Sequence, residues 1–206
     1  MSMRPEVLLD IDGVAANFIA GCIPAAEAII GRPVLHDDID QFMIEKALGM
    51  DEEQTAALYE CVMSEGWCRA LPVYEGAKEA VAFMQQHADV IPVTAHFFSS
   101  KHWVYERDAW LIEHLGIAQT DIVHTHRKFQ IDGDVLIDDK ISHIRSWIGR
   151  RPTKRAVLFQ RRYNQSETIE RTSNITMING WTALVDYLSD VFGWPGVKTV
   201  SLEGRA

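Results

Sequence analysis

The sequence lacks the features that mark secreted or membrane-spanning chains. It contains three cysteines among 206 residues, Cys22, Cys61 and Cys68, and no CxxC pair. An odd number without paired spacing argues against a disulfide framework and indicates free thiols in a reducing compartment. No apolar run approaches the roughly 18 residues needed to cross a bilayer, and the N-terminus shows no secretory signal pattern. We therefore expect a cytoplasmic location and no membrane partner.

Basic charge is also scarce, because 20 Lys and Arg residues face 29 Asp and Glu residues for a formal net charge of −9. This balance disfavours a nucleic-acid partner, which would be contacted by a basic patch or stripe. It does not exclude a small phosphorylated substrate, because a local cationic pocket can exist in an acidic protein. The length suits one domain with a modest insertion.

Short apolar runs alternate with amphipathic stretches along most of the chain. Strands are expected at residues 7–9, 90–93, 122–123, 135–137, 156–159 and 175–178. Helices are expected at residues 75–86, 99–115, 141–148 and 181–191. Such alternation is typical of a parallel sheet that is covered on both faces. We therefore predict an α/β fold with a doubly wound, Rossmann-like parallel sheet as its core.

Residues 17–72 differ from the rest because they show helical spacing and no convincing strand. One helix is expected from Val14 to Ile30, and Asp51 with Gln54 forms the pattern of a capping box that starts another. We predict a core domain of residues 1–16 plus 73–206, with residues 17–72 as a small helical cap inserted after the first strand.

Polar side chains follow three of the predicted strands. Asp10 and Asp12 follow the first strand, Thr94 follows the second, and Asp138-Asp139 follows the strand at 135–137. Ligands of open α/β sheets bind at the carboxyl ends of the strands. Two carboxylates two positions apart point to the same side, and their repulsion is relieved by a cation. An acidic surface turn is the alternative interpretation of the first pair.

The second acidic pair strengthens the interpretation as a metal site. Carboxylates at the tip of a continuous apolar strand are costly to bury unless something neutralises them. A Mg²⁺ ion shared by Asp10 and Asp138 would do so, although Asp139 also suits a helix N-cap. Thr94 offers a hydroxyl and an amide to a phosphate, and Lys128 would neutralise both the nucleophile and the phosphate. Each residue is ambiguous alone, so the inference rests on the set.

The order D-x-D-G-V, then Thr, then Lys, then D-D resembles the four motifs of the haloacid dehalogenase (HAD) superfamily. More narrowly, the chain is similar to the 5'(3')-deoxyribonucleotidase family over most of its length, to about residue 190. The stretches that carry this similarity are residues 10–18 and 71–77, Trp110 with Leu115-Gly116, the spacing across 127–139, and residues 157–159 followed by Tyr163-Asn164-Gln165.

The resemblance implies a reaction and a role for each motif residue. Asp10 would attack phosphorus and form an aspartyl-phosphate. Asp12 would protonate the leaving alkoxide and then deprotonate the hydrolytic water. Mg²⁺ would be bound by Asp10, the backbone carbonyl of Asp12 and Asp138, with Asp139 as an outer or alternate ligand. Thr94 and Lys128 would bind the phosphoryl oxygens, and the cap would exclude water.

The resemblance also implies a nucleoside monophosphate substrate and a homodimer. The candidate substrate-binding residues are Phe18, Trp67, Ala95, His96 and Lys101. Phe18 and Trp67 are cap aromatics that either stack on a base or fill the core of the cap. His96 departs from the family, which has proline there, and is either a substrate contact or an ordinary loop residue. Lys101 ranks below Lys128 as a phosphate ligand.

Three other functions remain open at this point. The same chemistry could act on a sugar phosphate or another small phosphomonoester. A receiver-type phosphoacceptor uses a similar set of residues, but it places the acidic pair first and has no helical insertion. An inactive binding module on the same fold is disfavoured by the complete motif set.

Overall fold

The computed structural model describes residues 4–169 and 174–195. Its centre is a six-stranded sheet in the order β3-β2-β1-β4-β5-β6, and every neighbouring pair is parallel. The strands are β1 Glu6–Leu9, β2 Asp89–Thr94, β3 Val123–His124, β4 Val135–Asp138, β5 Arg155–Phe159 and β6 Ile175–Ile178. The chain moves outward from β1 in both directions, which confirms the predicted doubly wound sheet.

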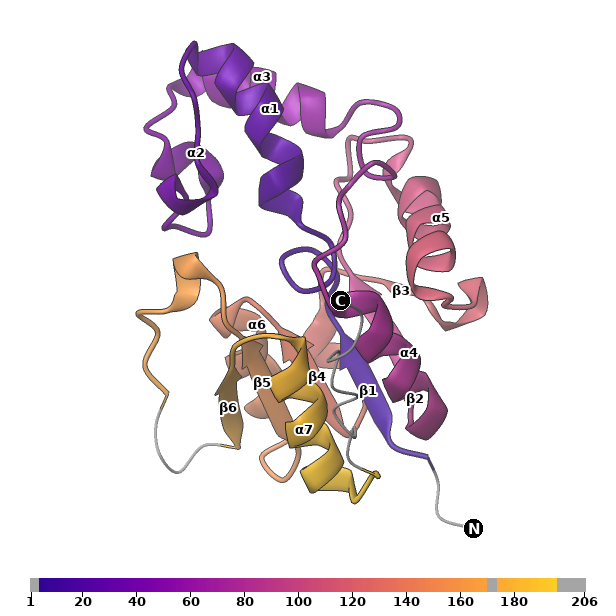
Figure 1. The fold of residues 1–206 in the computed structure, drawn as a ribbon. Helices are drawn as coiled ribbons and strands as arrows, with labels where there is room; N and C mark the ends of the chain where they lie inside the picture. Colours follow the sequence, from indigo (N-terminus) through magenta and orange to yellow (C-terminus); the bar gives the residue numbers. More distant parts are fainter. Residues whose placement is uncertain (1–3, 170–173, 196–206) are drawn as a thin grey trace, which may run out of the picture.

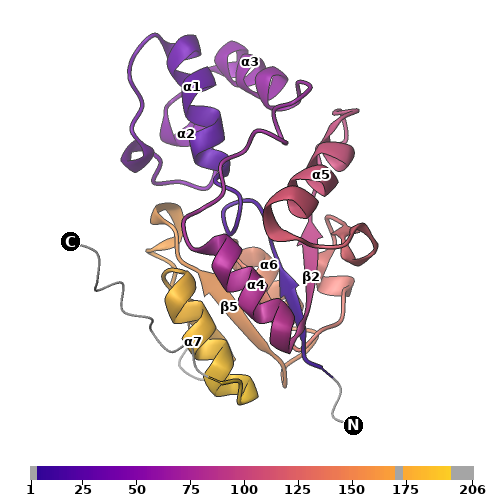
Figure 2. The same cartoon turned by 45° about the vertical axis from the view of Figure 1, so that its right-hand side comes forward.

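Helices cover both faces of this sheet. They are α4 Ala77–His87, α5 Trp103–Leu115, α6 Ile141–Ile148 and α7 Trp181–Phe192. Alternate strand residues point to opposite faces. Val7 and Leu9 therefore join the core beneath α4 and α7, whereas Leu8 joins Ile144 and Trp147 of α6 on the other side. Figure 2 shows α4 and α7 in front of the sheet and α6 behind it.

A second group of helices lies beyond the carboxyl end of the sheet (Figure 1). It contains α1 Phe18–Ile30, α2 Ile44–Ala47 and α3 Glu52–Val62. The capping box at the start of α3 is confirmed, because the Asp51 carboxylate accepts from Gln54 N at 2.8 Å and Gln54 Oε1 accepts from Asp51 N at 3.1 Å. The remaining helical segments are 3-10 turns at His36–Asp38, Gln119–Asp121, Lys128–Gln130 and Arg162–Asn164.

Helix α1 starts later than the sequence predicts. The amides of Val14, Ala15 and Ala16 all donate to the carbonyl of Ile11, at 3.2, 2.9 and 2.8 Å, so this segment forms a compact loop. Asn17 then caps α1 by accepting from Ala20 N at 3.0 Å. The expectation of helix from Val14 is therefore wrong by one turn, because this loop takes up the backbone donors.

None of the helices within the described ranges combines the length and apolarity that a membrane crossing requires.

Candidate active site

The pairing of β1 with β4 brings the two acidic motifs together. Leu9 is the register partner of Ile137, and Asp10 N donates to the Ile137 carbonyl at 2.9 Å. Asp10 and Asp138 therefore lie side by side at the carboxyl edge of the sheet. On the other side of β1, β2 ends at Thr94, so three segments far apart in the sequence converge here.

A single buried lysine bridges the two acids. The Nζ of Lys128 lies 2.6 Å from Asp10 Oδ1 and 2.8 Å from Asp138 Oδ2. The Lys128 side chain is 3% exposed, and it comes from the 3-10 turn between β3 and β4. Its ammonium group thus contacts both carboxylates from inside the protein.

One lysine does not neutralise the three buried carboxylates. Burial and then repulsion by Asp138 raise the pKa of Asp10 to about 7. Burial and then repulsion by Asp10 and Asp138 raise the pKa of Asp139 well above its usual range. Burial would also raise the pKa of Asp138, but Lys128 and a hydrogen bond with His143 lower it to about 2. The cluster is therefore short of positive charge, which a divalent cation would supply.

The donor set fits such a cation. Asp10, Asp138 and His143 each offer one ligand atom, and these atoms all lie within 4.8 Å of one another. Carboxylate oxygens are the donors that Mg²⁺ prefers. The Asp139 carboxylate instead accepts a hydrogen bond from the Tyr163 hydroxyl. His143 was not predicted from the sequence.

Asp12 is paired with an arginine that sequence reasoning missed. Its Oδ1 accepts a close hydrogen bond from Arg107 of α5. The Arg107 side chain is fully buried, with its guanidinium carbon 5.5 Å from the ring centres of both Trp103 and Trp110. Nothing in the spacing of α5 distinguishes this arginine from a solvated one, so only the packing reveals it.

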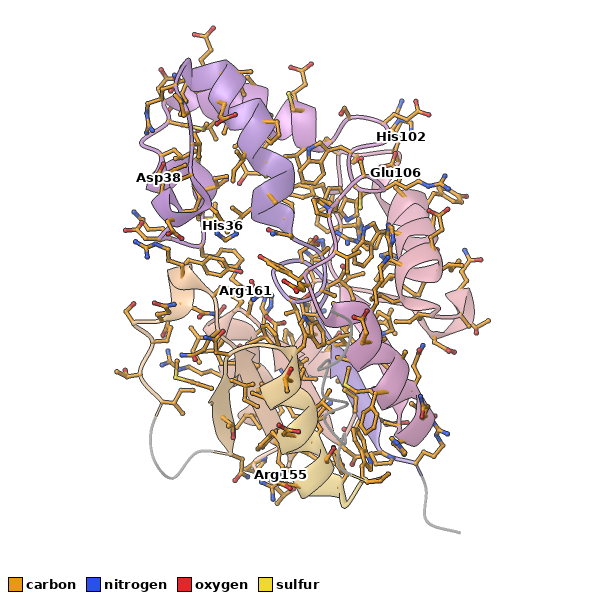
Figure 3. The ribbon with its side chains drawn as sticks, in the orientation of Figure 1. His36, Asp38, His102, Glu106, Arg155 and Arg161 are labelled. Atoms are coloured by element: carbon orange, nitrogen blue, oxygen red, sulfur yellow. The ribbon has the colours of Figure 1, made fainter. Side chains whose placement is uncertain are left out.

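The loop that carries both aspartates is tightly held. Gly13 adopts a φ of +77°, and a Cβ there would overlap the Asp139 carboxylate and the Tyr163 hydroxyl. Glycine is therefore required on steric grounds. Arg161 donates to the carbonyls of Gly13 and Val14 and stacks 3.7 Å from the centre of the Tyr74 ring. In Figure 3, Arg161 lies between the sheet and the α1–α3 helices.

A cavity of about 300 Å³ opens above these residues. Its charged lining includes Asp10, Asp12, Lys128 and Asp139. Its apolar walls come from both helical groups and include Phe18, Phe42, Tyr59, Phe97 and Trp103. The cavity therefore combines a cluster of charges with an aromatic chamber.

The other predicted residues lie at varied distances from this cavity. Ala95 and His96 line it. Thr94 is buried beneath it, with its hydroxyl donating to the Ala95 carbonyl at 3.3 Å. Trp67 is not part of the lining and packs behind Phe18, with ring centres 5.2 Å apart. Lys101 is exposed and is not part of the lining either.

Comparison with solved structures defines the class to which this fold belongs. A haloacid dehalogenase-like hydrolase from Streptococcus pneumoniae superposes with a TM-score of 0.58 at 10% identity, covering 91% of this chain and 100% of that one. A hydrolase of the same description from Xanthomonas campestris gives 0.57 at 13% identity, with 93% and 98% covered. The fold is thus that of the haloacid dehalogenase-like hydrolases.

Sequence comparison narrows the class to one family. The family described as "5' nucleotidase, deoxy (Pyrimidine), cytosolic type C protein" matches residues 4–183. The human cytosolic-type 5'(3')-deoxyribonucleotidase is 31% identical over 150 residues, which cover 68% of this chain and 73% of that protein. The chain belongs to this 5'-nucleotidase family, which makes it a phosphomonoester hydrolase as the sequence predicted.

Proposed function

We propose that the protein hydrolyses nucleoside monophosphates, with deoxynucleotides preferred, through a phosphorylated Asp10. One observation carries the proposal. A single cavity is lined both by Asp10, Asp12 and Lys128 and by the aromatic side chains of Phe18 and Trp103. A phosphate is an anion that needs the first kind of surface, and a nucleobase is a flat ring that stacks on the second.

The first step forms a bond between Asp10 and phosphorus. The contacts that the described residues make to the Asp10 carboxylate all reach Oδ1, from Ile11 N at 2.7 Å and from Lys128. Oδ2 is therefore the oxygen that attacks. The phosphorus–oxygen ester bond breaks as the new bond forms, and the nucleoside leaves with a proton donated by Asp12.

The second step returns the enzyme to its starting state. Asp12, now ionised, takes a proton from a water molecule, and the resulting hydroxide attacks the phosphorus of the acyl phosphate. Inorganic phosphate leaves, and the Asp10 carboxylate is restored. The buried guanidinium of Arg107 fixes the direction of the Asp12 carboxylate and thereby orients this proton exchange.

Charge neutralisation accompanies both steps. Lys128 and the backbone amide and hydroxyl of Thr94 bind phosphoryl oxygens, with a change of rotamer at Thr94. A divalent cation such as Mg²⁺, held by Asp10, Asp138 and the carbonyl of Asp12, would neutralise the phosphoryl charge and orient the phosphate. Asp139 supports this site from outside through its bond with Tyr163.

The cap would form the specificity side of the pocket. Residues 17–72 supply Phe18, which would stack on the base, with Trp67 fixing its ring from behind. Ala95 and His96 border the region between phosphate and sugar, and Lys101 would contact the substrate only after a movement of its loop. We extend the proposal to a cytoplasmic location and a homodimer, the latter testable by light scattering.

A substrate panel with and without Mg²⁺ tests this function. We expect deoxynucleoside monophosphates to be hydrolysed with a higher kcat/KM than ribonucleotides, and both above sugar phosphates. A preference for sugar phosphates would overturn the nucleotide assignment but leave the chemistry intact.

The phosphorylated aspartate is tested separately by acid quenching with ³²P-labelled substrate. The wild type should retain label on the protein, and Asp10→Asn should retain none. Asp190→Asn, which changes an exposed acid at the end of α7, is the matched control and should label like the wild type. Turnover that survives in Asp10→Asn would refute the covalent route.

A further inference from the structure

His143 is the one histidine that touches the acidic cluster among the described residues. It is the third residue of α6, and its side chain turns back over the end of β4. Its Nδ1 lies 3.0 Å from Asp138 Oδ2 and 3.2 Å from Asp138 Oδ1. The side chain is 31% exposed and lines the same cavity as Asp10 and Lys128.

These distances match the spacing of ligands around one metal ion. A six-coordinate ion with bonds of about 2.1–2.2 Å keeps adjacent ligand atoms about 3.0 Å apart and opposite ones about 4.3 Å apart. The Nδ1 of His143 and a carboxylate oxygen of Asp138 have the adjacent spacing. Adding Asp10 gives a triad whose ligand atoms all lie within 4.8 Å, so one ion can contact all three with small side-chain rotations.

Asp138 accepts hydrogen bonds from two further donors besides His143. Its Oδ2 accepts from Lys128 Nζ at 2.8 Å, and its Oδ1 accepts from Lys140 N at 2.8 Å. These two donors already fix the carboxylate. When a cation is bound, these two donors can continue to hold Asp138 while the His143 ring carries its proton on Nε2 and presents the Nδ1 lone pair to the ion.

We propose that His143 is a nitrogen ligand of the cation site, and that this site binds transition-metal ions such as Mn²⁺ and Co²⁺ more tightly than Mg²⁺. The reason is chemical. Imidazole nitrogen binds divalent transition metals well, whereas Mg²⁺ prefers an all-oxygen shell. The inference rests on the proposed function, because it assigns an extra ligand to the ion site described there.

Electron spin-echo spectroscopy of the Mn²⁺-loaded protein tests the bond directly. A histidine ligand gives a ¹⁴N modulation, which should change to the ¹⁵N pattern when the histidines are ¹⁵N-labelled. His143→Asn should abolish the nitrogen signal. His126→Asn, which removes another histidine of the same cavity, should retain it. Bound Mn²⁺ without nitrogen coupling in the wild type would overturn the proposal, and this measurement needs no variant to fold.

Calorimetric titration tests the selectivity. In His143→Asn, the affinity for Co²⁺ should fall by roughly tenfold or more, in the range seen when groups that support a metal are removed. The affinity for Mg²⁺ should change by less than about threefold, because the asparagine carbonyl keeps an oxygen at that position. His143→Asp should shift the preference toward Mg²⁺. Equal losses for both ions would show that His143 only orients Asp138, and would overturn the proposal.

The two levels of inference fail in different ways. If the wild type binds neither Mn²⁺ nor Mg²⁺, or if Asp138→Asn binds both normally, the ion site itself is wrong and both proposals fall. If ions bind with a 1:1 ratio that Asp138→Asn abolishes, but no nitrogen coupling appears, only the assignment of His143 falls.

Discussion

The two ends of the sheet carry the same kinds of charged residue in opposite surroundings. At the carboxyl end, Lys128 pairs with Asp10 and Asp138, and all three side chains are less than 10% exposed. At the amino end, Lys154 lies 2.6 Å from Asp134, with 37% and 38% of their side chains exposed. Figure 3 labels Arg155, which begins β5 at this amino end, and Arg161, which follows β5 at the other.

The difference in exposure changes what each ion pair contributes to the stability of the fold. An exposed pair contributes at most about 1 kcal/mol, because water screens it. For a buried pair, the attraction between the charges only partly offsets the free energy of removing them from water. The burial of two acids and a lysine at one edge of the sheet therefore lowers the stability of the fold. The proposed nucleophile and the proposed cation site both lie in this buried cluster.

The largest expected effect comes from replacing Asp12 at the carboxyl end, with Asp134 at the amino end as the control. Asp12→Asn should lower kcat on nucleotides by about 10²–10⁴-fold, because the proton donor and acceptor is lost. Binding of inorganic phosphate should stay close to that of the wild type, since the cation site is retained. Asp134→Asn should leave both unchanged. Near-normal turnover in Asp12→Asn would remove its assigned role.

Replacing the lysine of each pair compares how much the buried and the exposed pair contribute to the free energy of unfolding. Lys128→Met should lower the free energy of unfolding of the metal-free protein by about 3 kcal/mol, because Asp10 and Asp138 lose their buried counter-charge. Lys154→Met should cost less than about 1 kcal/mol. Urea unfolding at pH 7 with a chelator measures both. Similar losses in the two variants would mean that the buried cluster is hydrated.

The grouping of polar residues at the carboxyl edge of the sheet could be predicted from the sequence, because it follows from the geometry of parallel strands. Polar residues that follow parallel strands must gather at one edge, so the convergence of Asp10, Thr94 and Asp138 follows without any knowledge of side-chain contacts. The alternation of strands and helices likewise predicted the order of the elements along the chain, and the helical spacing without a strand predicted the helical character of residues 17–72.

What the sequence could not supply are contacts that depend on packing between elements. Arg107 reads as an ordinary helical position until α5 packs against the loop that carries Asp12. His143 reads as part of an amphipathic helix until α6 turns it over the end of β4. Trp67 and Lys101 lie outside the cavity lining, which their residue types and positions in the sequence did not indicate.

A third comparison tests whether Arg107 acts on the proton donor. In Arg107→Met, kcat/KM for a nucleotide should fall by roughly tenfold or more, whereas kcat/KM for p-nitrophenyl phosphate should fall much less, because that leaving group needs little protonation. Arg107→Lys should recover part of the nucleotide activity. Arg4→Met, at the amino end, should leave kcat/KM unchanged for both substrates. Equal losses on both substrates would reduce Arg107 to a packing role.

The smallest expected effect is the pH dependence of the exposed pair. Partial burial would raise the pKa of Asp134, but hydrogen bonds from Lys154 and from the amide of Glu6 lower it below its usual value of 3.8. A lowered carboxyl pKa stabilises the fold above pH 3.8, and this contribution is lost as the pH falls through the folded-state pKa. Asp134→Asn should therefore cost less than about 1 kcal/mol at pH 7 and progressively less at pH 3. Thermal unfolding of both proteins across this range measures the difference, and a cost that persists undiminished at pH 3 would show that shape, and not charge, holds this end of the sheet.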